Sequence, residues 1–191
     1  ILVKGKSIPD QRAQLDLIAL GHVDPMVLSV AAANIQGVFR LATNISAVRP
    51  RPSYAYIPSR GQYDAAKIIK SLAAEQGGAP LKLAITPYDL CISILTYVYG
   101  ESQLGGRVAV VSTNRLIHPL IRERTLERIA KICVHEVGHI FGLEHCWETG
   151  CLMRFSKQLE QLDKLSLLFC SACEYEIARR LKRMFEKTVQ E

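Results

Sequence analysis

Residues 135–146 read HEVGHIFGLEHC, and this stretch decides how the rest of the chain is interpreted. His135 and His139 lie four positions apart, so on a helix both imidazoles project from one face and can hold one metal ion. Glu136 lies one position further round the helix and can reach a water molecule on that metal without binding the metal itself. The stretch therefore predicts a metal-binding helix with a carboxylate beside the metal.

The residues after this helix supply a third candidate ligand. Gly142 can adopt the left-handed conformation that ends a helix, and the chain can then turn so that His145 reaches the same ion. Three protein ligands leave one coordination position open for water, as a catalytic zinc site requires. Zinc lowers the pKa of its water to about 7 and polarises a substrate carbonyl, while Glu136 can carry the proton to the leaving amine. The pattern predicts amide hydrolysis without an acyl-enzyme.

A simpler interpretation is that these side chains are polar residues on a helix face and bind no metal. The HExxH spacing alone leaves that alternative open, and the added G-x-x-H weakens it strongly. The chain has two more histidines, His22 at the end of a predicted strand and His118 before a proline. We interpret both as ordinary polar residues.

Four of the six cysteines form a second group with metal-binding spacing. Cys146 and Cys151 form C-x4-C, Cys170 and Cys173 form C-x-x-C, and the segment between the pairs has the usual length for a four-cysteine zinc site. Four thiolates close the coordination shell, so this zinc is expected to be structural. The surrounding segment is short of core residues, and zinc would supply folding free energy there.

Two disulfides or free buried thiols are the alternatives for these cysteines. No secretory signal is recognisable at the start of the sequence, and we expect a cytoplasmic protein in which metal binding is favoured over disulfides. Cys91 and Cys133 lie in apolar stretches and are expected to be small buried side chains. Cys146 directly follows His145, so one backbone segment would serve both metals.

Further from the motif, apolar runs and turn residues predict the remaining elements. Asp24-Pro25 predicts the start of a helix, and Gly77-Gly78 predicts the end of another. Residues 49–63 are proline-rich and are expected to be irregular. The predicted strands are residues 15–23, 40–48 and 81–86, with a hairpin joining 95–104 to 107–112; the predicted helices are residues 24–39, 64–76, 122–141 and 172–187.

Strands and helices alternate before residue 120, and no strand is evident after residue 146. This order predicts an α/β, or α+β, fold with two parts. We expect a catalytic subdomain over residues 1–145, which ends with the active-site helix. A small, mostly helical C-terminal subdomain over residues 146–191 would contain the four-cysteine zinc site.

The extended motif resembles that of the metzincins, which are zinc peptidases with HExxHxxGxxH followed by a methionine turn. Within that clan the chain resembles the archaemetzincins, whose motif continues C-x4-C-x-M and then C-x-x-C. Here these residues are Cys146-WETG-Cys151, Leu152 and Met153, followed by Cys170-SA-Cys173. The motif match covers residues 135–173, and the order of elements upstream is compatible with the family fold.

The resemblance implies a zincin fold with a twisted mixed sheet of about five strands, a backing helix and an active-site helix. It also implies a cleft bordered by an antiparallel edge strand, expected within residues 95–104, to which an extended peptide adds as a further strand. Met153 would form an apolar floor under the zinc without ligating it. Phe155 stands two residues after Met153, where some metzincins have a tyrosine, so no phenol there can stabilise the oxyanion.

Composition limits the possible partners. The formal net charge of +6 tolerates anionic partners without requiring them, and no apolar run approaches the roughly 20 residues of a membrane span. We expect a monomer that binds two Zn2+ and a peptide or protein substrate, and neither a membrane nor nucleic acid. The basic residues of the last predicted helix are spread around it without interleaved aromatic residues, which is typical of a solvated surface. They are Arg179, Arg180, Lys182, Arg183 and Lys187.

The function predicted from the sequence is therefore zinc-dependent peptide hydrolysis, with Glu136 as general base. The alternative is a protein without turnover, or with very narrow specificity, that binds peptides and retains the metal site. The presence of Glu136 argues against this alternative, because a binding protein has no need of a general base.

Overall fold

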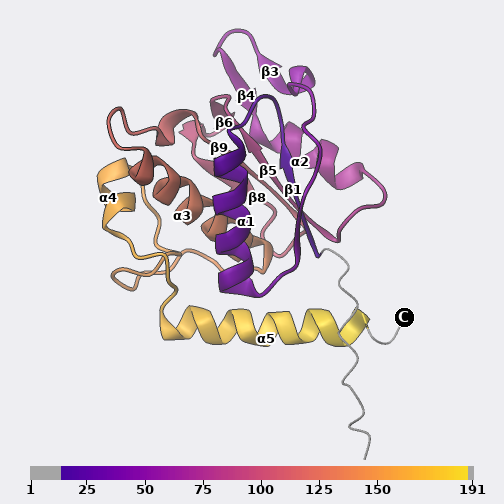
Figure 1. Cartoon of the computed structure of the whole chain (residues 1–191), viewed down its shortest axis with the longest axis vertical. Helices are drawn as coiled ribbons and strands as arrows, with labels where there is room; N and C mark the ends of the chain where they lie inside the picture. The colour runs from indigo at the N-terminus through magenta and orange to yellow at the C-terminus, as the bar shows by residue number, and fades with distance from the viewer. Residues whose placement is uncertain (1–13, 189–191) are drawn as a thin grey trace, which may run out of the picture.

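A five-stranded sheet forms the middle layer of the molecule in the computed structural model, which describes residues 14–188 and the side chains as far as residue 183 (Figure 1). The strand order is β2-β1-β5-β9-β8, with four parallel strands and an antiparallel edge strand, β8. The strands are β1 (Leu15–Ala19), β2 (Thr43–Ile45), β5 (Leu81–Thr86), β8 (Gly100–Ser102) and β9 (Val108–Ser112). The expected mixed sheet of about five strands is confirmed.

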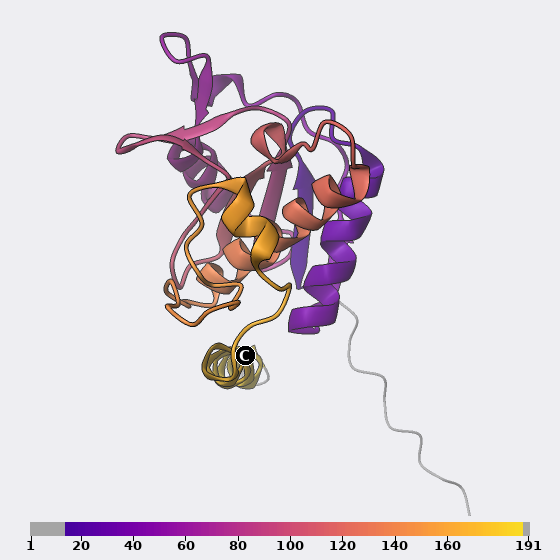
Figure 2. The same ribbon diagram turned by 90° about the vertical axis from the view of Figure 1, so that its left-hand side faces the viewer.

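The central strands are buried on both faces because helices cover both sides of the sheet (Figures 1 and 2). Leu15 and Leu17 face the helices α1 (Pro25–Phe39) and α3 (Arg122–Ile140). Ile18 and Leu20 face the opposite way, toward α2 (Ala65–Ala74). The alternation of side chains along each strand thus builds two apolar cores, and the three-layer arrangement holds α3 against the sheet.

Aspartates begin the first two helices. Asp24 accepts a hydrogen bond from Met26 N at 2.9 Å, and Asp64 accepts one from Lys67 N at 3.2 Å. The predicted start of α1 at Asp24-Pro25 is confirmed.

The predicted end of the second helix at Gly77 is wrong, because α2 stops at Ala74. Glu75 is extended, and its carboxylate pairs with Arg49 at 2.6 Å and with the buried Lys82 at 3.1 Å. Those ion pairs end the helix before the glycines are reached.

A second, four-stranded sheet with the order β3-β4-β6-β7 was not predicted. Part of the segment expected to be irregular, residues 49–63, forms strands of this sheet. The strand expected within residues 95–104 is also divided, because its first half joins the second sheet and its second half is the edge strand β8. The strands are β3 (Tyr56–Ile57), β4 (Gln62–Asp64), β6 (Leu90–Ile92) and β7 (Leu95–Val98), and two short 3-10 turns are η1 (Ser53–Ala55) and η2 (Asn114–Leu116).

Two further helices follow α3. They are α4 (Leu159–Lys164), which was not predicted, and α5 (Ser171–Thr188), which lies below the rest of the molecule in Figure 1. Among the described residues no strand follows residue 146, as expected. Phe169, Cys173 and Ile177 pack into the same apolar core as α1 and α3. In the described part of the chain, no helix is long and apolar enough to cross a membrane.

The basic residues of α5 lie on a helix with internal ion pairs. Arg179 and Arg180 both bind Glu176, at 2.7 and 2.6 Å. The side chain of Lys187 lies outside the described residues. These pairs agree with the interpretation of this helix as a solvated surface.

An ion pair joins α3 to α4 and should make stability depend on pH. Arg128 donates two hydrogen bonds of 2.7 Å to the Asp163 carboxylate, and Arg128 is only 6% exposed. The guanidinium holds the pKa of Asp163 below its ordinary value. The unfolded chain holds the Asp163 proton with a pKa of about 3.9, and the folded chain holds it more weakly. The ion pair therefore stabilises the fold fully above that unfolded pKa, and its contribution is lost as pH falls through the lower pKa of the folded state.

We therefore expect Asp163→Asn to lower the free energy of unfolding by about 1–3 kcal/mol at pH 7, measured in urea. The difference from the parent should shrink as pH falls below the unfolded pKa of about 3.9. It should vanish below the depressed folded pKa, where Asp163 itself becomes protonated. The exposed neighbour Glu160, changed to Gln, serves as control and should stay within about 0.5 kcal/mol. Equal stability of the Asn variant and the parent at pH 7 would contradict this prediction.

Candidate metal centres and the cleft between them

Three histidines converge at the C-terminal end of α3. His135 and His139 project from one face of the helix with their Nε2 atoms 3.0 Å apart, and His145 returns beside them after Gly142, whose φ of +80° requires a glycine. Each of the three rings offers a nitrogen, and these nitrogens all lie within 4.8 Å of one another. The structure thus brings the three predicted ligands together.

The hydrogen bonds of the two helical histidines fit a metal ion between them. The Nδ1 atoms of His135 and His139 lie 2.8 and 2.6 Å from the carbonyl oxygens of Leu152 and Leu143, so Nδ1 carries the proton of each neutral ring. Their Nε2 lone pairs then face each other at 3.0 Å, which is repulsive unless a cation lies between them. Burial lowers the pKa of His135 to about 3, so a proton does not readily take that place. A divalent ion that prefers imidazole, such as zinc, fits.

The methionine turn supports this group from below. Met153 is fully buried, and its Sδ lies so close to the helix that a Cβ added to Gly138 would be 2.7 Å from it. The carbonyl of Leu152 holds His135, and the carbonyl of Met153 accepts a hydrogen bond from Cys146 N at 2.9 Å. This turn therefore positions one ligand on the helix and the segment that carries His145.

The four predicted cysteines also come together. The Sγ atoms of Cys146 and Cys170 are 3.8 Å apart, as are those of Cys151 and Cys173. A disulfide requires about 2.05 Å, and all four thiols are free. Four sulfurs at about 2.3 Å from one zinc ion would be separated by about 3.8 Å along each edge of the tetrahedron. Burial raises the pKa of Cys151 and Cys173, so a bound cation is needed to hold both as thiolates.

The two cysteines outside this group are buried as expected. Cys91 and Cys133 are both 0% exposed. His22 is exposed, and His118 accepts hydrogen bonds from Leu120 N and Ile121 N just before α3 begins. Both histidines lie apart from the clusters, as predicted.

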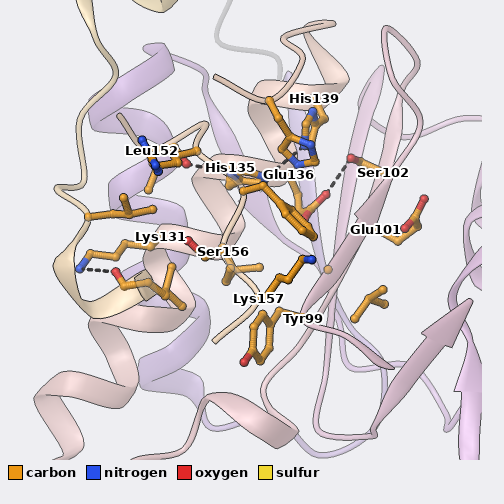
Figure 3. Close-up of a pocket in the computed structure, with 18 of the residues that line it drawn as sticks. Tyr99, Glu101, Ser102, Lys131, His135, Glu136, His139, Leu152, Ser156 and Lys157 are labelled. Atoms are coloured by element: carbon orange, nitrogen blue, oxygen red, sulfur yellow. Dashed lines mark hydrogen bonds between the residues drawn. The ribbon is translucent and has the colours of Figure 1, made fainter. Parts of the chain in front are cut away.

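Glu136 lies under the edge strand β8, next to the histidines. Its side chain is buried, and burial raises its pKa to about 8, while a hydrogen bond from Ser102 acts in the opposite direction. Ser102 Oγ donates to Glu136 Oε2 at 2.7 Å (Figure 3). The sequence analysis did not identify Ser102, because only the register of β8 over α3 places it there.

A cleft of about 860 Å³ opens over these groups. One wall is formed by the chain from β7 to β8, and the other by residues that follow Met153 and by α4. Figure 3 shows His135, Glu136 and His139 at the cleft, with Tyr99, Glu101, Ser156 and Lys157 around it. Several exposed apolar side chains also line it, namely Leu95, Leu104, Trp147 and Phe155. Apolar walls around a few polar groups are typical of a ligand site.

Gly100 allows the close approach of β8 to Glu136. A Cβ at this position would lie 2.6 Å from Glu136 Cγ, so Gly100→Ala should displace the carboxylate. We expect a loss of about 10²-fold in peptide cleavage with unchanged metal content, since displacements near 1 Å can have that effect. Gly37→Ala is the matched control: nothing lies within 4 Å of its added Cβ, and stability should rise by up to about 1 kcal/mol. Unchanged cleavage by the Gly100 variant would show that β8 does not position Glu136.

The chain matches the model of peptidase family M54 over residues 59–179. It is 36% identical over 173 residues to the archaemetzincin of Methanopyrus kandleri, covering 89% of this chain and 98% of that protein. The archaemetzincin of Pyrococcus furiosus is 30% identical over 184 residues, covering 90% and 96%.

Solved structures show the same fold. The crystal structure of the Methanopyrus kandleri archaemetzincin superposes with a TM-score of 0.83 at 33% identity, covering 93% of this chain and 99% of that one. A zinc-dependent peptidase from Methanocorpusculum labreanum has a TM-score of 0.75 at 24% identity, covering 85% and 99%, and shares the fold. The resemblance of the motif is thus confirmed: the chain belongs to the archaemetzincins, peptidase family M54, and is a zinc metallopeptidase.

Proposed function

We propose that the cleft hydrolyses peptide bonds with a catalytic zinc on His135, His139 and His145 and with Glu136 as general base. The observation that carries this proposal is the position of a buried carboxylate beside three converging imidazoles, at the floor of an open cleft. The four cysteines would hold a second, structural zinc.

The bound catalytic zinc would polarise the substrate carbonyl and make a water molecule more acidic. Glu136 accepts a proton from the attacking water, whose oxygen forms a bond to the carbonyl carbon. Glu136 then gives the proton to the amide nitrogen as the C–N bond breaks, so that a carboxylic acid and an amine leave, and the acid then loses its proton to the amine in water. Ser102 holds Oε2 of Glu136, which keeps the carboxylate in one orientation during both transfers.

The edge strand β8 offers backbone groups to a substrate. Tyr99 O and Gln103 N bond to the neighbouring β9, at 2.8 and 3.0 Å. Because backbone groups alternate along an antiparallel strand, those of Gly100 and Ser102 face away from β9, toward the cleft. An extended peptide can add there as a further strand, so within residues 95–104 we assign the edge role to β8.

The structural zinc would act on the catalytic one through the backbone. Cys146 is a ligand of the four-cysteine group and neighbours His145, and its N–H is bound to the Met153 carbonyl. Closing the four-cysteine site therefore limits where the third histidine can point. Phe155 contacts the His145 ring at 4.9 Å between centroids, so the position that could hold a phenol packs against a ligand instead.

Peptide cleavage tests this function directly. The zinc-loaded protein is incubated with a mixed peptide library, and the products are identified by mass spectrometry. New chain ends that disappear when the metal is chelated and return with added zinc would support hydrolysis at this site. The absence of metal-dependent products across the library would favour the alternative of a peptide-binding protein.

A further inference from the structure

Toward one end of the cleft, a hydrogen bond joins its two walls. Tyr97, in β7, donates a hydrogen bond from its hydroxyl to the carbonyl of Lys157, at 3.2 Å. Lys157 belongs to the segment after the methionine turn, on the opposite wall. An extended peptide that follows β8 toward β7 therefore meets a barrier.

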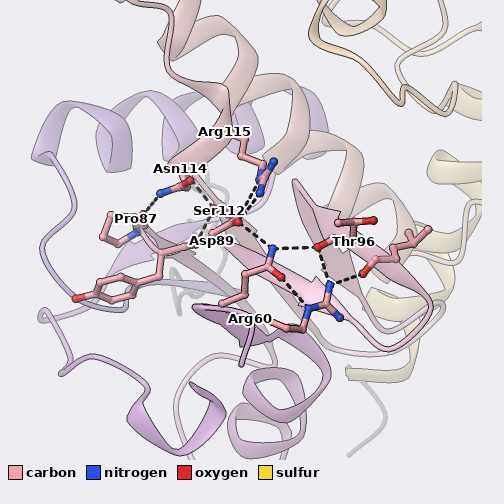
Figure 4. Close-up of polar contacts among 10 residues, drawn as sticks. Arg60, Pro87, Asp89, Thr96, Ser112, Asn114 and Arg115 are labelled. Atoms are coloured by element: carbon pink, nitrogen blue, oxygen red, sulfur yellow. Dashed lines mark hydrogen bonds and ion pairs between the residues drawn. The ribbon is translucent and has the colours of Figure 1, made fainter. Parts of the chain in front are cut away.

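A network of polar contacts surrounds the strand that carries Tyr97, and Figure 4 shows its members Arg60, Asp89, Thr96 and Arg115. The Arg115 guanidinium lies 4.2 Å from the centre of the Tyr97 ring and binds Asp89 through two hydrogen bonds of 2.7 Å. On the other side, Arg60 donates to the carbonyls of Leu95 and Thr96 at 2.9 and 2.7 Å. The barrier is thus built on a strand held at several points.

Lys157 also places a positive charge beside this contact. Figure 3 shows its side chain pointing into the cleft, and no hydrogen bond or ion pair of its ammonium is found among the described residues. The other cations that line the cleft are engaged: Lys131 pairs with Glu127 at 2.6 Å, and Arg154 donates to the Trp147 carbonyl at 2.9 Å. Lys157 is therefore the cleft cation that remains available to a ligand.

The charges along the cleft orient a peptide. The β8–β9 turn packs on the end of α3, where Gly105 N bonds to His139 O at 2.9 Å, and the exposed acidic residue Glu144 lines that end. Lys157 lines the opposite end. A peptide would place its ammonium terminus toward Glu144 and its carboxylate toward Lys157. That direction is antiparallel to β8, as hydrogen bonding to this edge favours.

The strand also sets how many residues fit before the barrier. Gly100 marks the position of the reacting bond, because Glu136 packs directly against it. Tyr97 lies three positions earlier, and a fully extended chain at about 3.3 Å per residue would span about 10 Å. The bend at Tyr99 between β7 and β8 makes this distance an upper limit. About one to three residues of an extended peptide fit between the reacting bond and the barrier.

We propose that this peptidase trims carboxyl termini: the free C-terminal carboxylate of the substrate binds the Lys157 ammonium, and a fragment of about one to three residues leaves. The inference rests on the proposed hydrolysis in the same cleft. The reaction is still the addition of one water across one amide bond. Lys157 selects the substrate and takes no part in the proton transfers.

Matched peptides with a free carboxylate or a C-terminal amide test this assignment. The two sets have the same sequences, and kcat/KM is measured for each with the zinc-loaded protein. The parent should prefer the free acids by at least about 10-fold, roughly the free energy of one charge-assisted hydrogen bond, and mass spectrometry should show short C-terminal fragments. Lys157→Gln should remove most of this preference, mainly through KM, and Lys157→Arg should retain it.

Lys164→Gln is the control, because Lys164 is an exposed lysine on α4 that does not line the cleft. Its acid-to-amide ratio should equal that of the parent. Equal cleavage of acids and amides by the parent would overturn the assignment while leaving the peptidase function intact. If Lys157→Gln lowered kcat equally for the free acids and the amides, the assignment would also be overturned. Lys157 would then act on the transition state and not on the C-terminal carboxylate. No cleavage of either set by the parent would overturn the proposed function as well.

Discussion

Replacing Glu136 with glutamine should lower kcat for peptide cleavage by about 10²–10⁴-fold, the usual contribution of a general acid–base group. Glutamine has nearly the same size and can still accept the hydrogen bond that Ser102 donates at 2.7 Å. It cannot take a proton from water near neutral pH. The loss should therefore appear in kcat, while the zinc content measured by atomic absorption should equal that of the parent.

Ser102→Ala is a useful comparison for this variant. It removes the hydrogen bond to Oε2 but keeps the carboxylate, so the loss of kcat should be smaller than in Glu136→Gln. Full activity of Glu136→Gln with normal zinc content would show that another group moves the proton, and the assigned mechanism would be wrong.

The second large effect is expected from the four-cysteine site. Cys173→Ala should remove one zinc per chain and lower the free energy of unfolding by several kcal/mol, because metal binding supplies folding free energy to such segments. Cys173 lies in the same apolar core as Phe169 and Ile177, so the loss should loosen the packing of α5. Unfolding in urea and zinc analysis on the same samples measure both effects.

Cys91→Ala is the matched control, since Cys91 is a buried thiol of the second sheet, outside both clusters. It should keep the parent's zinc content and lose only about 1 kcal/mol through a small cavity. Cys173→Ala should also weaken zinc at the histidines, because Cys146 and His145 share one backbone segment. A Cys173 variant that retains the parent's zinc content and stability would show that these thiols bind no structural metal.

Much of the candidate site follows from local sequence. The spacing of His135 and His139 on a helix places both rings on one face, and Gly142 then takes the left-handed conformation that brings the chain round to His145. These features depend on residues that are close in the chain. For the same reason the start of α1 at Asp24-Pro25 and the strand β5 (Leu81–Thr86) were predicted with their bounds.

Other features depended on contacts between distant segments, and here the sequence analysis was incomplete or wrong. Helix α2 ends at Ala74 because Glu75 is drawn to Arg49 and Lys82. The segment 95–104, which was expected to form one strand, is divided between the two sheets. The sequence pattern of this segment does not show which sheet either half joins. The second sheet was missed because its strands have only two to four residues, too few to show a period.

The sequence by itself determined the chemistry of this protein: which side chains can hold metal, which carboxylate can move a proton, and where the active-site helix ends. Only the tertiary structure decided the shape of the cleft. It placed Gly100 and Ser102 against Glu136 and joined Tyr97 to Lys157 across the cleft. The physical reason is that ligand spacing on one helix is set by local backbone geometry. Contacts between strands and loops far apart in the chain are set by packing of the whole core, which no short stretch of sequence encodes.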